Sequence, residues 1–213
     1  MKTRSKALLL ALCAVLLVAA TIFGTMAYLT STDTVTNTFT VGKVNIKLDE
    51  AKANPDGSLV ANADRVKENQ YKLLPGHTYN KDPMVTVLSG SESSYVKMTV
   101  TFSKAKELDA IFAPDGANLT SIFNGYDAAN WTYKGNTKDA TANTRTYEFW
   151  YKEAVAAPTA DVALDALFDS ITVPGEITGA QRATIAGMTI TVNAYAIQAD
   201  GFADADAAWA AFH

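Results

Sequence analysis

The feature that most constrains this chain is a two-residue alternation of apolar and polar side chains in several short segments. Every second residue from Val96 to Phe102 is apolar, and residues 188–196 repeat the pattern. A period of two places alternate side chains on opposite faces of an extended strand, so both segments predict half-buried β-strands. Weaker signals of the same kind predict three more strands, over residues 84–88, 146–151 and 170–173.

Helical signals are few and short. They predict helices over residues 105–112, 162–168 and 204–212, and Asp204 is placed to cap the last of these. Turn chemistry is clear at residues 54–57, Asn-Pro-Asp-Gly, and residues 89–94 are expected to form a polar hairpin loop. Scattered strands with few helices predict an all-β fold, namely a single antiparallel jelly-roll or β-sandwich domain.

The first 27 residues have the three parts of a secretory signal peptide. A basic stretch at residues 1–6 precedes an apolar helix-length run at residues 7–23, and Thr25 and Ala27 supply the small side chains that a signal peptidase reads. Cleavage before Tyr28 would release residues 28–213 as a secreted domain, in the extracellular matrix or on the cell surface. The alternative is an uncleaved anchor, which would then be the chain's only contact with the membrane.

Charge and cysteine content limit the partners and the chemistry. The 213 residues contain 18 Lys and Arg against 22 Asp and Glu, for a net charge of −4. Nucleic acid is not an expected partner, because binding to phosphate requires a surplus of clustered basic residues. The single cysteine, Cys13, lies inside the signal segment, so residues 28–213 can form neither disulfides nor a thiolate metal site.

The residue pattern also argues against catalysis. The chain has two histidines, His77 and His213, and lacks the His-Glu-x-x-His motif, the Gly-x-Ser-x-Gly motif and the glycine-rich phosphate loops. His77 follows a Pro-Gly turn, which predicts a surface loop. Asp200, Asp204 and Asp206 depart from the EF-hand pattern and are better explained as a helix cap and a solvated face. We therefore predict no catalytic residue, no metal and no cofactor.

Residues 28–48 predict an extended segment at the start of the secreted domain. It is rich in Thr and Val, contains no Pro and carries one charge, Asp33, before Lys43. Its apolar positions are odd before Gly42 and even after it, which predicts a bend or bulge at that glycine. The positions concerned are Val35, Phe39 and Val41, then Val44, Ile46 and Leu48. Such a strand can add to the open sheet edge of another chain, or pair within its own domain and leave a monomer.

Residues 24–48 resemble the start of the TasA/camelysin family of Gram-positive surface proteins. In that family, a signal peptide ending in G-T-x-A is followed by Y/F-[FLT]-x-[ST]-D, then by a Thr- and Asn-rich stretch, and then by F-x-x-G-x-[VL]-x-[IL]. The corresponding residues of this chain are Gly24-Thr25-Met26-Ala27, Tyr28 to Asp33 and Phe39 to Ile46. Three later segments agree: residues 74–83, 94–100 and 194–209. Residues 103–184 carry little of the resemblance.

The resemblance implies a jelly-roll protein processed by a SipW-type signal peptidase. It implies assembly into biofilm matrix fibres, with the segment freed by cleavage completing the sheet of the next copy or of a related matrix subunit. The donor-strand residues would then be Val35, Phe39, Val41, Gly42, Val44 and Ile46. Two alternatives remain: a camelysin-like surface metalloprotease, against which the missing zinc motif weighs, and a non-polymerising adhesion module that uses the aromatic residues between Trp131 and Tyr151.

Overall fold

The computed structural model describes residues 11–17, 42–111 and 122–212, and the chain divides into two units, residues 1–41 and 42–213. In the first unit, residues 11–17 are helical and their side chains are exposed. Among the described residues, no helix is both long and apolar enough to cross a membrane. The predicted cleavage residues and the first half of the predicted donor strand lie outside the described residues: Thr25, Ala27, Tyr28, Val35, Phe39 and Val41.

A four-stranded antiparallel sheet forms one layer of the second unit. Its strand order is β5–β6–β4–β9, with β4 at Ser94–Ser103, β5 at Trp131–Asp139, β6 at Thr144–Tyr151 and β9 at Ile190–Gln198. Burial alternates at every residue of β4, as its sequence predicts, and the predicted strand at β9 is also confirmed. The hairpin of β5 and β6 contains a bulge between Tyr133 and Gly135.

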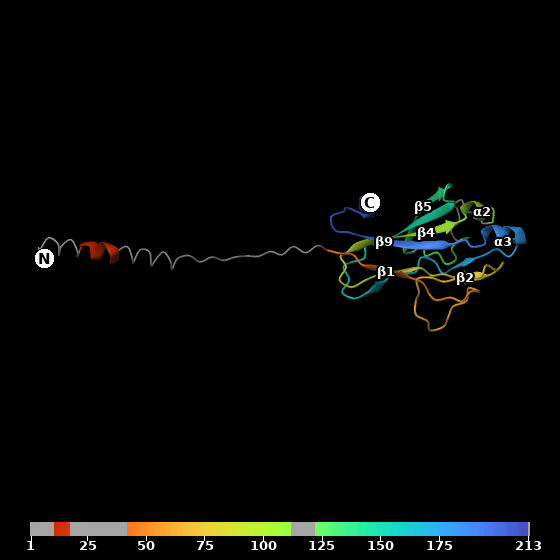
Figure 1. Ribbon diagram of the computed structural model, residues 1–213, viewed down its shortest axis with the longest axis horizontal. Helices are drawn as coiled ribbons and strands as arrows, with labels where there is room; N and C mark the ends of the chain where they lie inside the picture. The colour runs from red at the N-terminus through yellow and green to blue at the C-terminus, as the bar shows by residue number, and fades with distance from the viewer. Residues whose placement is uncertain (1–10, 18–41, 112–121, 213) are drawn as a thin grey trace. The chain divides into compact units, whose positions relative to one another are not determined.

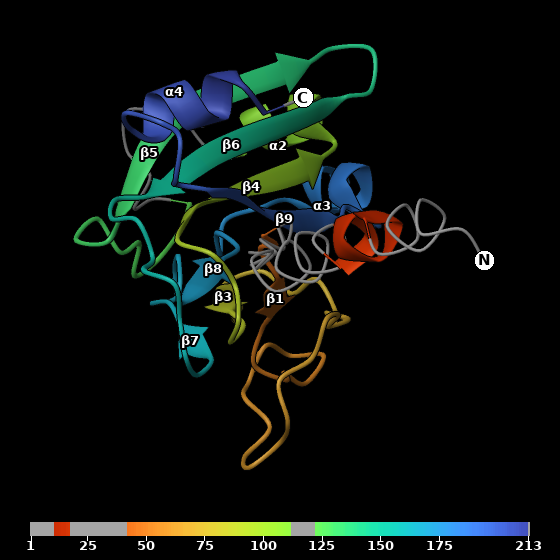
Figure 2. The same ribbon diagram turned by 90° about the vertical axis from the view of Figure 1, so that its left-hand side faces the viewer.

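Two smaller antiparallel sheets form the other layer (Figure 2). One has the order β1–β3–β7, with β1 at Ile46–Asp49, β3 at Met84–Val87 and β7 at Val162–Ala163. The other pairs β2 at Thr78–Asn80 with β8 at Ser170–Thr172. Because β3 and β4 belong to different sheets, residues 89–94 do not form the predicted hairpin loop; they carry the chain from one layer to the other. The all-β prediction is confirmed.

The hydrophobic core lies between these layers. Met98 and Phe149 from the four-stranded sheet and Val85 from β3 have no exposed surface, and they belong to one buried cluster that includes side chains from both layers. Trp131 and Tyr147 are also buried in this cluster, with 1% and 2% exposed surface. These two aromatic side chains of the middle region therefore pack the core instead of forming an exposed platform.

The described residues of the domain also form three short helices: α2 at Ala105–Asp109, α3 at Gly179–Ile185 and α4 at Ala205–Ala210. The predicted cap is confirmed, because Asp204 Oδ1 accepts the N–H of Ala207 at 2.8 Å. The predicted helix over residues 162–168 is wrong. Its buried apolar side chains gave a helical spacing, but the backbone N–H groups of Leu164 and Leu167 donate to Val85 and Pro83, so the segment lies along β3.

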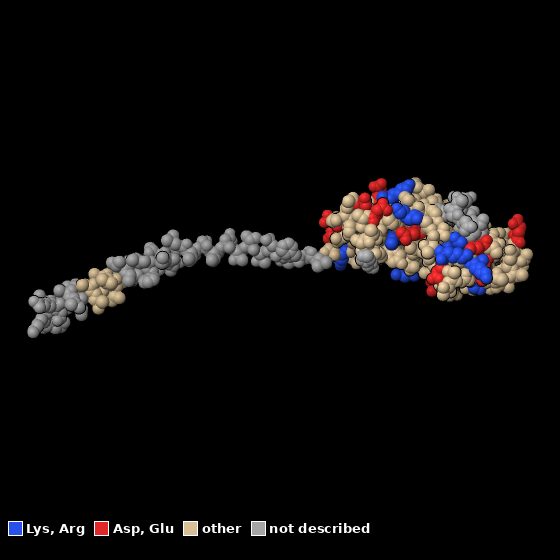
Figure 3. Space-filling view, turned by 90° about the horizontal axis from the view of Figure 1, so that it is seen from above, with Lys and Arg blue, Asp and Glu red and all other residues tan. Residues whose placement is uncertain are grey.

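Helix α4 lies over the outer face of the four-stranded sheet (Figure 2). Trp209 on α4 has its ring centroid 6.0 Å from that of Trp150 on β6. The Nζ of Lys97 lies 4.6 Å from the Trp209 ring centroid, and the Nζ of Lys134 lies 3.8 Å from that of Trp150. The contact of Lys97 with Trp209 joins the C-terminal helix to the sheet, and the contact of Lys134 with Trp150 joins β5 to β6. On the face drawn in Figure 3, acidic and basic side chains of this unit lie side by side.

Candidate functional site

The most distinctive feature of the domain is a pair of open sheet edges that lie next to each other. Strand β1 pairs with no strand but β3, and strand β9 with no strand but β4, so within the described part of the chain each has one edge without a partner strand. The free edge of β1 is short, because Glu50, directly after the strand, pairs with Val66 through both its N–H and its C=O. The two strands are neighbours across the layers (Figures 1 and 2). An unpaired edge presents a row of N–H and C=O groups that another extended chain can pair with.

A groove of about 840 Å³ opens beside these edges. It is bounded by the end of β1, by loop residues 66–73 and by residues 187–192, which lead into β9; we call it the seam groove. Leu48, Ile190 and Val192 contribute apolar side chains to it, and Ile171 of β8 lies at its floor. The groove thus combines unpaired backbone with exposed apolar surface.

The core-facing side of β9 is incompletely covered. Its residues pack against the core but are only half-buried: Ile190, Val192, Ala194 and Ala196. The equivalent residues of the adjacent strand β4 have almost no exposed surface. Because β4 and β9 are hydrogen-bonded neighbours in one sheet, the difference arises from what lies beside β9. A further strand at this edge would bury apolar area that is now in contact with water.

The start of the domain is held by its own backbone contacts. Lys43 O accepts from the N–H of Glu92 at 3.0 Å, and Asn45 O accepts from the N–H of Leu88 at 2.9 Å. Ile46 then begins β1 opposite Val87. The predicted donor residues Gly42, Val44 and Ile46 therefore lie in the domain itself, and Ile46 forms a strand pair within its own chain. Gly42, where the sequence predicts a bend, precedes this anchored stretch, so residues 28–41 are the part of the predicted donor strand that lies before it.

A charged network lies beside the seam groove, at the end of β1. The Nε of Arg65 lies 2.5 Å from Asp49 Oδ1, and its Nη1 lies 2.8 Å from Asp82 Oδ2. Burial opposes ionisation of Asp49, but hydrogen bonds and charges from Lys47 and Arg65 outweigh it and lower the pKa of that carboxyl. Arg65 thereby ties the loop that borders the groove to the end of β1.

Acid is expected to weaken the domain through two such carboxyls. Burial also opposes ionisation of Asp109, yet Lys138 and Arg145 lower its pKa, as the partners of Asp49 lower that of Asp49. A carboxyl whose pKa is lower in the folded state stabilises it fully above its unfolded-state pKa of about 3.9, and this contribution is lost as pH falls through the lower folded-state value.

Urea midpoints should therefore fall steeply below about pH 4. Asp109→Asn should lower the midpoint at pH 7, and the gap to the unsubstituted protein should shrink at acid pH. An equal gap at both pH values would contradict a role for the Asp109 carboxylate in the acid response.

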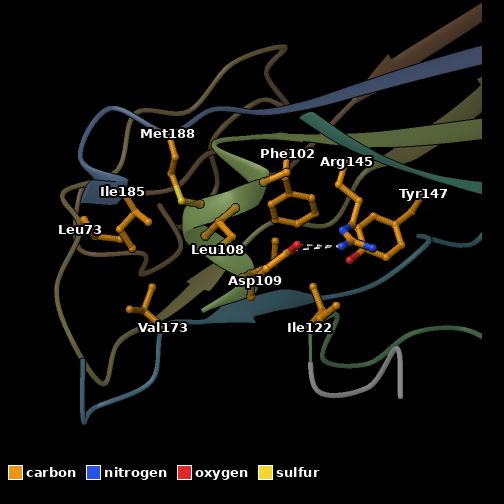
Figure 4. Close-up of a pocket in the computed structure, with 12 residues that line it drawn as sticks. Leu73, Phe102, Leu108, Asp109, Ile122, Arg145, Tyr147, Val173, Ile185 and Met188 are labelled. Carbon is orange, nitrogen blue, oxygen red and sulfur yellow. Dashed lines mark hydrogen bonds and ion pairs between the residues drawn. The ribbon is translucent and has the colours of Figure 1, made fainter. Parts of the chain in front are cut away.

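A smaller cavity of about 30 Å³ adjoins the seam groove, and the two share lining residues that include Leu73, Ile185 and Met188 (Figure 4). Phe102, Leu108 and Met188 give it apolar walls, and the ion pair between Arg145 Nη2 and Asp109 Oδ1, at 3.0 Å, lies at one side. A space of this size holds a water molecule or two and no organic ligand. This cavity is part of the packing of the core.

The residues that sequence reasoning considered for metal binding lie apart. His77 is exposed in its turn, with Nδ1 3.4 Å from the carbonyl oxygen of Asp56. In the described ranges, no group of three His, Cys, Asp or Glu side chains could hold a metal ion. Asp204 serves as the α4 cap, and Asp206 forms an exposed ion pair with Lys134.

Comparisons of the chain with protein-family models, with curated proteins and with solved structures found no match. What the chain does is therefore inferred from its own residues. The seam groove is the strongest candidate site, because it joins two unpaired sheet edges to apolar surface. Sequence reasoning predicted a strand that could add to a sheet edge but not the groove, whose long loop border has no periodic signal.

Proposed function

We propose that residues 28–213 form a secreted structural protein of the extracellular matrix that assembles into fibres. In each contact, residues 28–41 of one copy add as a strand in the seam groove of the next copy. The observation that carries this proposal is the groove, in which β1 and β9 have unpaired edges beside half-buried apolar side chains. The resemblance of residues 24–48 to the TasA/camelysin family supports the same function.

The chemistry of the tail matches that of the groove. Residues 28–41 are rich in Thr and Val, contain no Pro and carry one charge. Extended at ~3.3 Å per residue, they span about 45 Å, whereas the nine residues of β9 span about 30 Å. The tail is therefore long enough to pair with the whole edge of β9 and still connect to the domain of its own copy.

The free energies of burial and of association set the condition for assembly. Burying Val35, Phe39 and Val41 yields about 5–9 kcal/mol, at ~1.5–3 kcal/mol for each side chain. Association costs about 4–15 kcal/mol, so side-chain burial alone does not secure the contact. Backbone hydrogen bonds along the edge of β9, at about 1 kcal/mol of net stabilisation each, would make the free energy of association favourable. Affinity should accordingly depend on the length of the paired strand.

The contact would be heterologous, since a tail on one copy meets a groove on another. Contacts of this kind produce open-ended polymers unless their rotation closes a ring. A tail that instead occupied the groove of its own copy would leave a monomer. Polymerisation therefore requires that a neighbouring groove compete successfully for the tail.

Export and fold complete the proposal. Residues 1–27 would be removed by a SipW-type signal peptidase before Tyr28, which frees the tail outside the cell. We also assign the domain to the jelly-roll class; the passage of the chain between layers after β3, β6 and β8 supports this assignment. Related matrix subunits could supply either the tail or the groove.

The proposal is tested with purified chain that begins at Tyr28. Electron micrographs should show filaments, and N-terminal sequencing of the secreted protein should begin at Tyr28. A monomer at every concentration and pH would overturn fibre formation. Chelator-sensitive cleavage of casein that disappears in His77→Ala would instead favour the metalloprotease alternative, and binding to a surface ligand by a permanent monomer would favour the adhesion module.

A further inference from the structure

Three side chains with complementary chemistry meet beside the end of β1. Glu50 follows β1, Asn69 lies in the long loop, and Lys81 follows β2. Lys81 Nζ lies 2.5 Å from Glu50 Oε2, and Asn69 Nδ2 donates to Glu50 Oε1 at 2.9 Å. Glu50 and Lys81 are almost completely buried, with 6% and 8% exposed surface. One carboxylate thus holds an amine and a carboxamide at its two oxygens.

We propose that Lys81 and Asn69 become joined by an intramolecular isopeptide bond, and that Glu50 is the catalytic group that promotes the reaction. The site lies in the wall of the seam groove, but the reaction takes place within one chain, so it depends neither on fibre assembly nor on a cofactor or second protein. The bond would close a covalent ring through the loop that borders the seam groove and β2.

The Asn69 carboxamide is held in a position in which it can act as the electrophile. Its Oδ1 accepts the backbone N–H of Ala53 at 2.8 Å, and its Nδ2 also donates to the carbonyl oxygen of Ala51 at 2.9 Å. The N–H of Ala53 is therefore directed at the oxygen on which negative charge develops when the amide carbon is attacked. These contacts also fix the orientation of the side chain, so the attacking amine meets a positioned group.

The reaction requires Lys81 as a neutral amine, and Glu50 Oε2, 2.5 Å from Lys81 Nζ, is placed to accept the proton that the ammonium must lose. A neutral amine is the nucleophile that amide attack requires. Burial raises the pKa of the nearby Tyr71 phenol, and the charge of Glu50 adds to this effect.

The chemistry balances without an oxidant or co-reactant. Glu50 accepts a proton from the Lys81 ammonium, and the free amine attacks Cγ of Asn69 to form the Nζ–Cγ bond. Glu50 then gives that proton to Nδ2, the Cγ–Nδ2 bond breaks, and the former amide nitrogen leaves as ammonia. Glu50 also takes a second proton from Nζ, which becomes the neutral amide nitrogen, and passes it to the ammonia, which departs as ammonium. One lysine proton stays on the new amide, two leave with the ammonium, and Glu50 ends as it began, ionised.

Mass spectrometry of the full chain expressed from its own sequence tests the proposal. The intact protein should be lighter than its sequence by one ammonia for each molecule. Trypsin cuts after Lys67, Lys72 and Lys97 but not after an acylated Lys81, so it should release residues 68–72 joined to residues 73–97 as one branched peptide. Separate peptides ending at Lys72 and at Lys81 would overturn the proposal, even if ammonia had been lost elsewhere.

Variants separate the covalent bond from an ordinary ion pair. Asn69→Ala removes the electrophile and keeps the Lys81–Glu50 pair, and Lys81→Arg keeps the charge but removes the amine; both should show the full mass. Glu50→Gln should also block the reaction, and Lys72→Arg, at a nearby exposed lysine, should retain the ammonia loss. The branched peptide in folded Asn69→Ala, or its persistence in folded Glu50→Gln, would contradict the assigned roles.

Discussion

A chain that begins at Gly42 is expected to stay monomeric at concentrations at which the chain that begins at Tyr28 forms fibres. The truncation removes the whole tail but keeps the residues that anchor β1, because among the described residues the first backbone contact to the rest of the domain is made by Lys43. The buried core lies within residues 42–213, so the fold should survive. Light scattering and electron microscopy measure the difference.

Two controls make this result specific. The circular dichroism spectrum and the urea midpoint of the truncated chain should show a cooperative fold. A synthetic peptide of residues 28–41 should bind the truncated chain and should slow fibre growth of the longer chain by filling free grooves. A peptide with Val35 and Phe39 both replaced by Asp should do neither. Fibres formed by the truncated chain would place the contact elsewhere on the domain.

Val192→Asp is expected to abolish fibre growth by blocking the groove, which is the other half of the contact that the tail makes. Val192 is half-buried in the seam groove, and a carboxylate there would lose water when a strand covers it. Burying an unpaired charge costs several kcal/mol, which is comparable to the entire side-chain gain from the tail. Asn193→Asp is the matched control, because that residue is the next one on β9 and points to solvent; it should still polymerise.

Mixing the two defective chains distinguishes one contact from two. The truncated chain has an intact groove and no tail, and Val192→Asp has an intact tail and a blocked groove. Together they should form pairs of one copy each and nothing larger, as measured by analytical ultracentrifugation. Fibres in the mixture would show that the tail and the seam groove do not meet in a single contact.

Sequence pattern predicted the strands that bury one face and missed those that do not. Apolar and polar side chains alternate along β4 and β9 because one face of each strand meets the core. This signal lies in the strand's own sequence and does not depend on which strand it pairs with. Strand β5 was missed, since the bulge at Gly135 breaks its alternation and only its first residue is fully buried. The helix predicted over residues 162–168 is wrong because the apolar residues Leu164, Leu167 and Phe168 have helical spacing. They are buried, but the segment that carries them bonds to β3 and its neighbour Pro83 instead of forming helical hydrogen bonds.

The candidate sites were harder to predict for a physical reason. The seam groove exists because two edges lack partners, and pairing is a property of the whole sheet that no local segment records. Glu50 and Lys81 are 31 positions apart, and Asn69 is 19 positions from Glu50, so nothing in the spacing links them. The tail stays a prediction, made from two local features: its composition and its place after the predicted cleavage site.

The anchoring of the chain at Lys43 and the position of the seam groove have a consequence for any fibre built from this domain. Each copy would give its tail to one neighbour and receive a tail from the other, so all copies would face the same way and the polymer would be polar. One terminus would display a vacant groove and the opposite terminus a loose strand, and the two should elongate at unequal rates. A cell could therefore nucleate or stop growth at a chosen terminus with a single capping subunit.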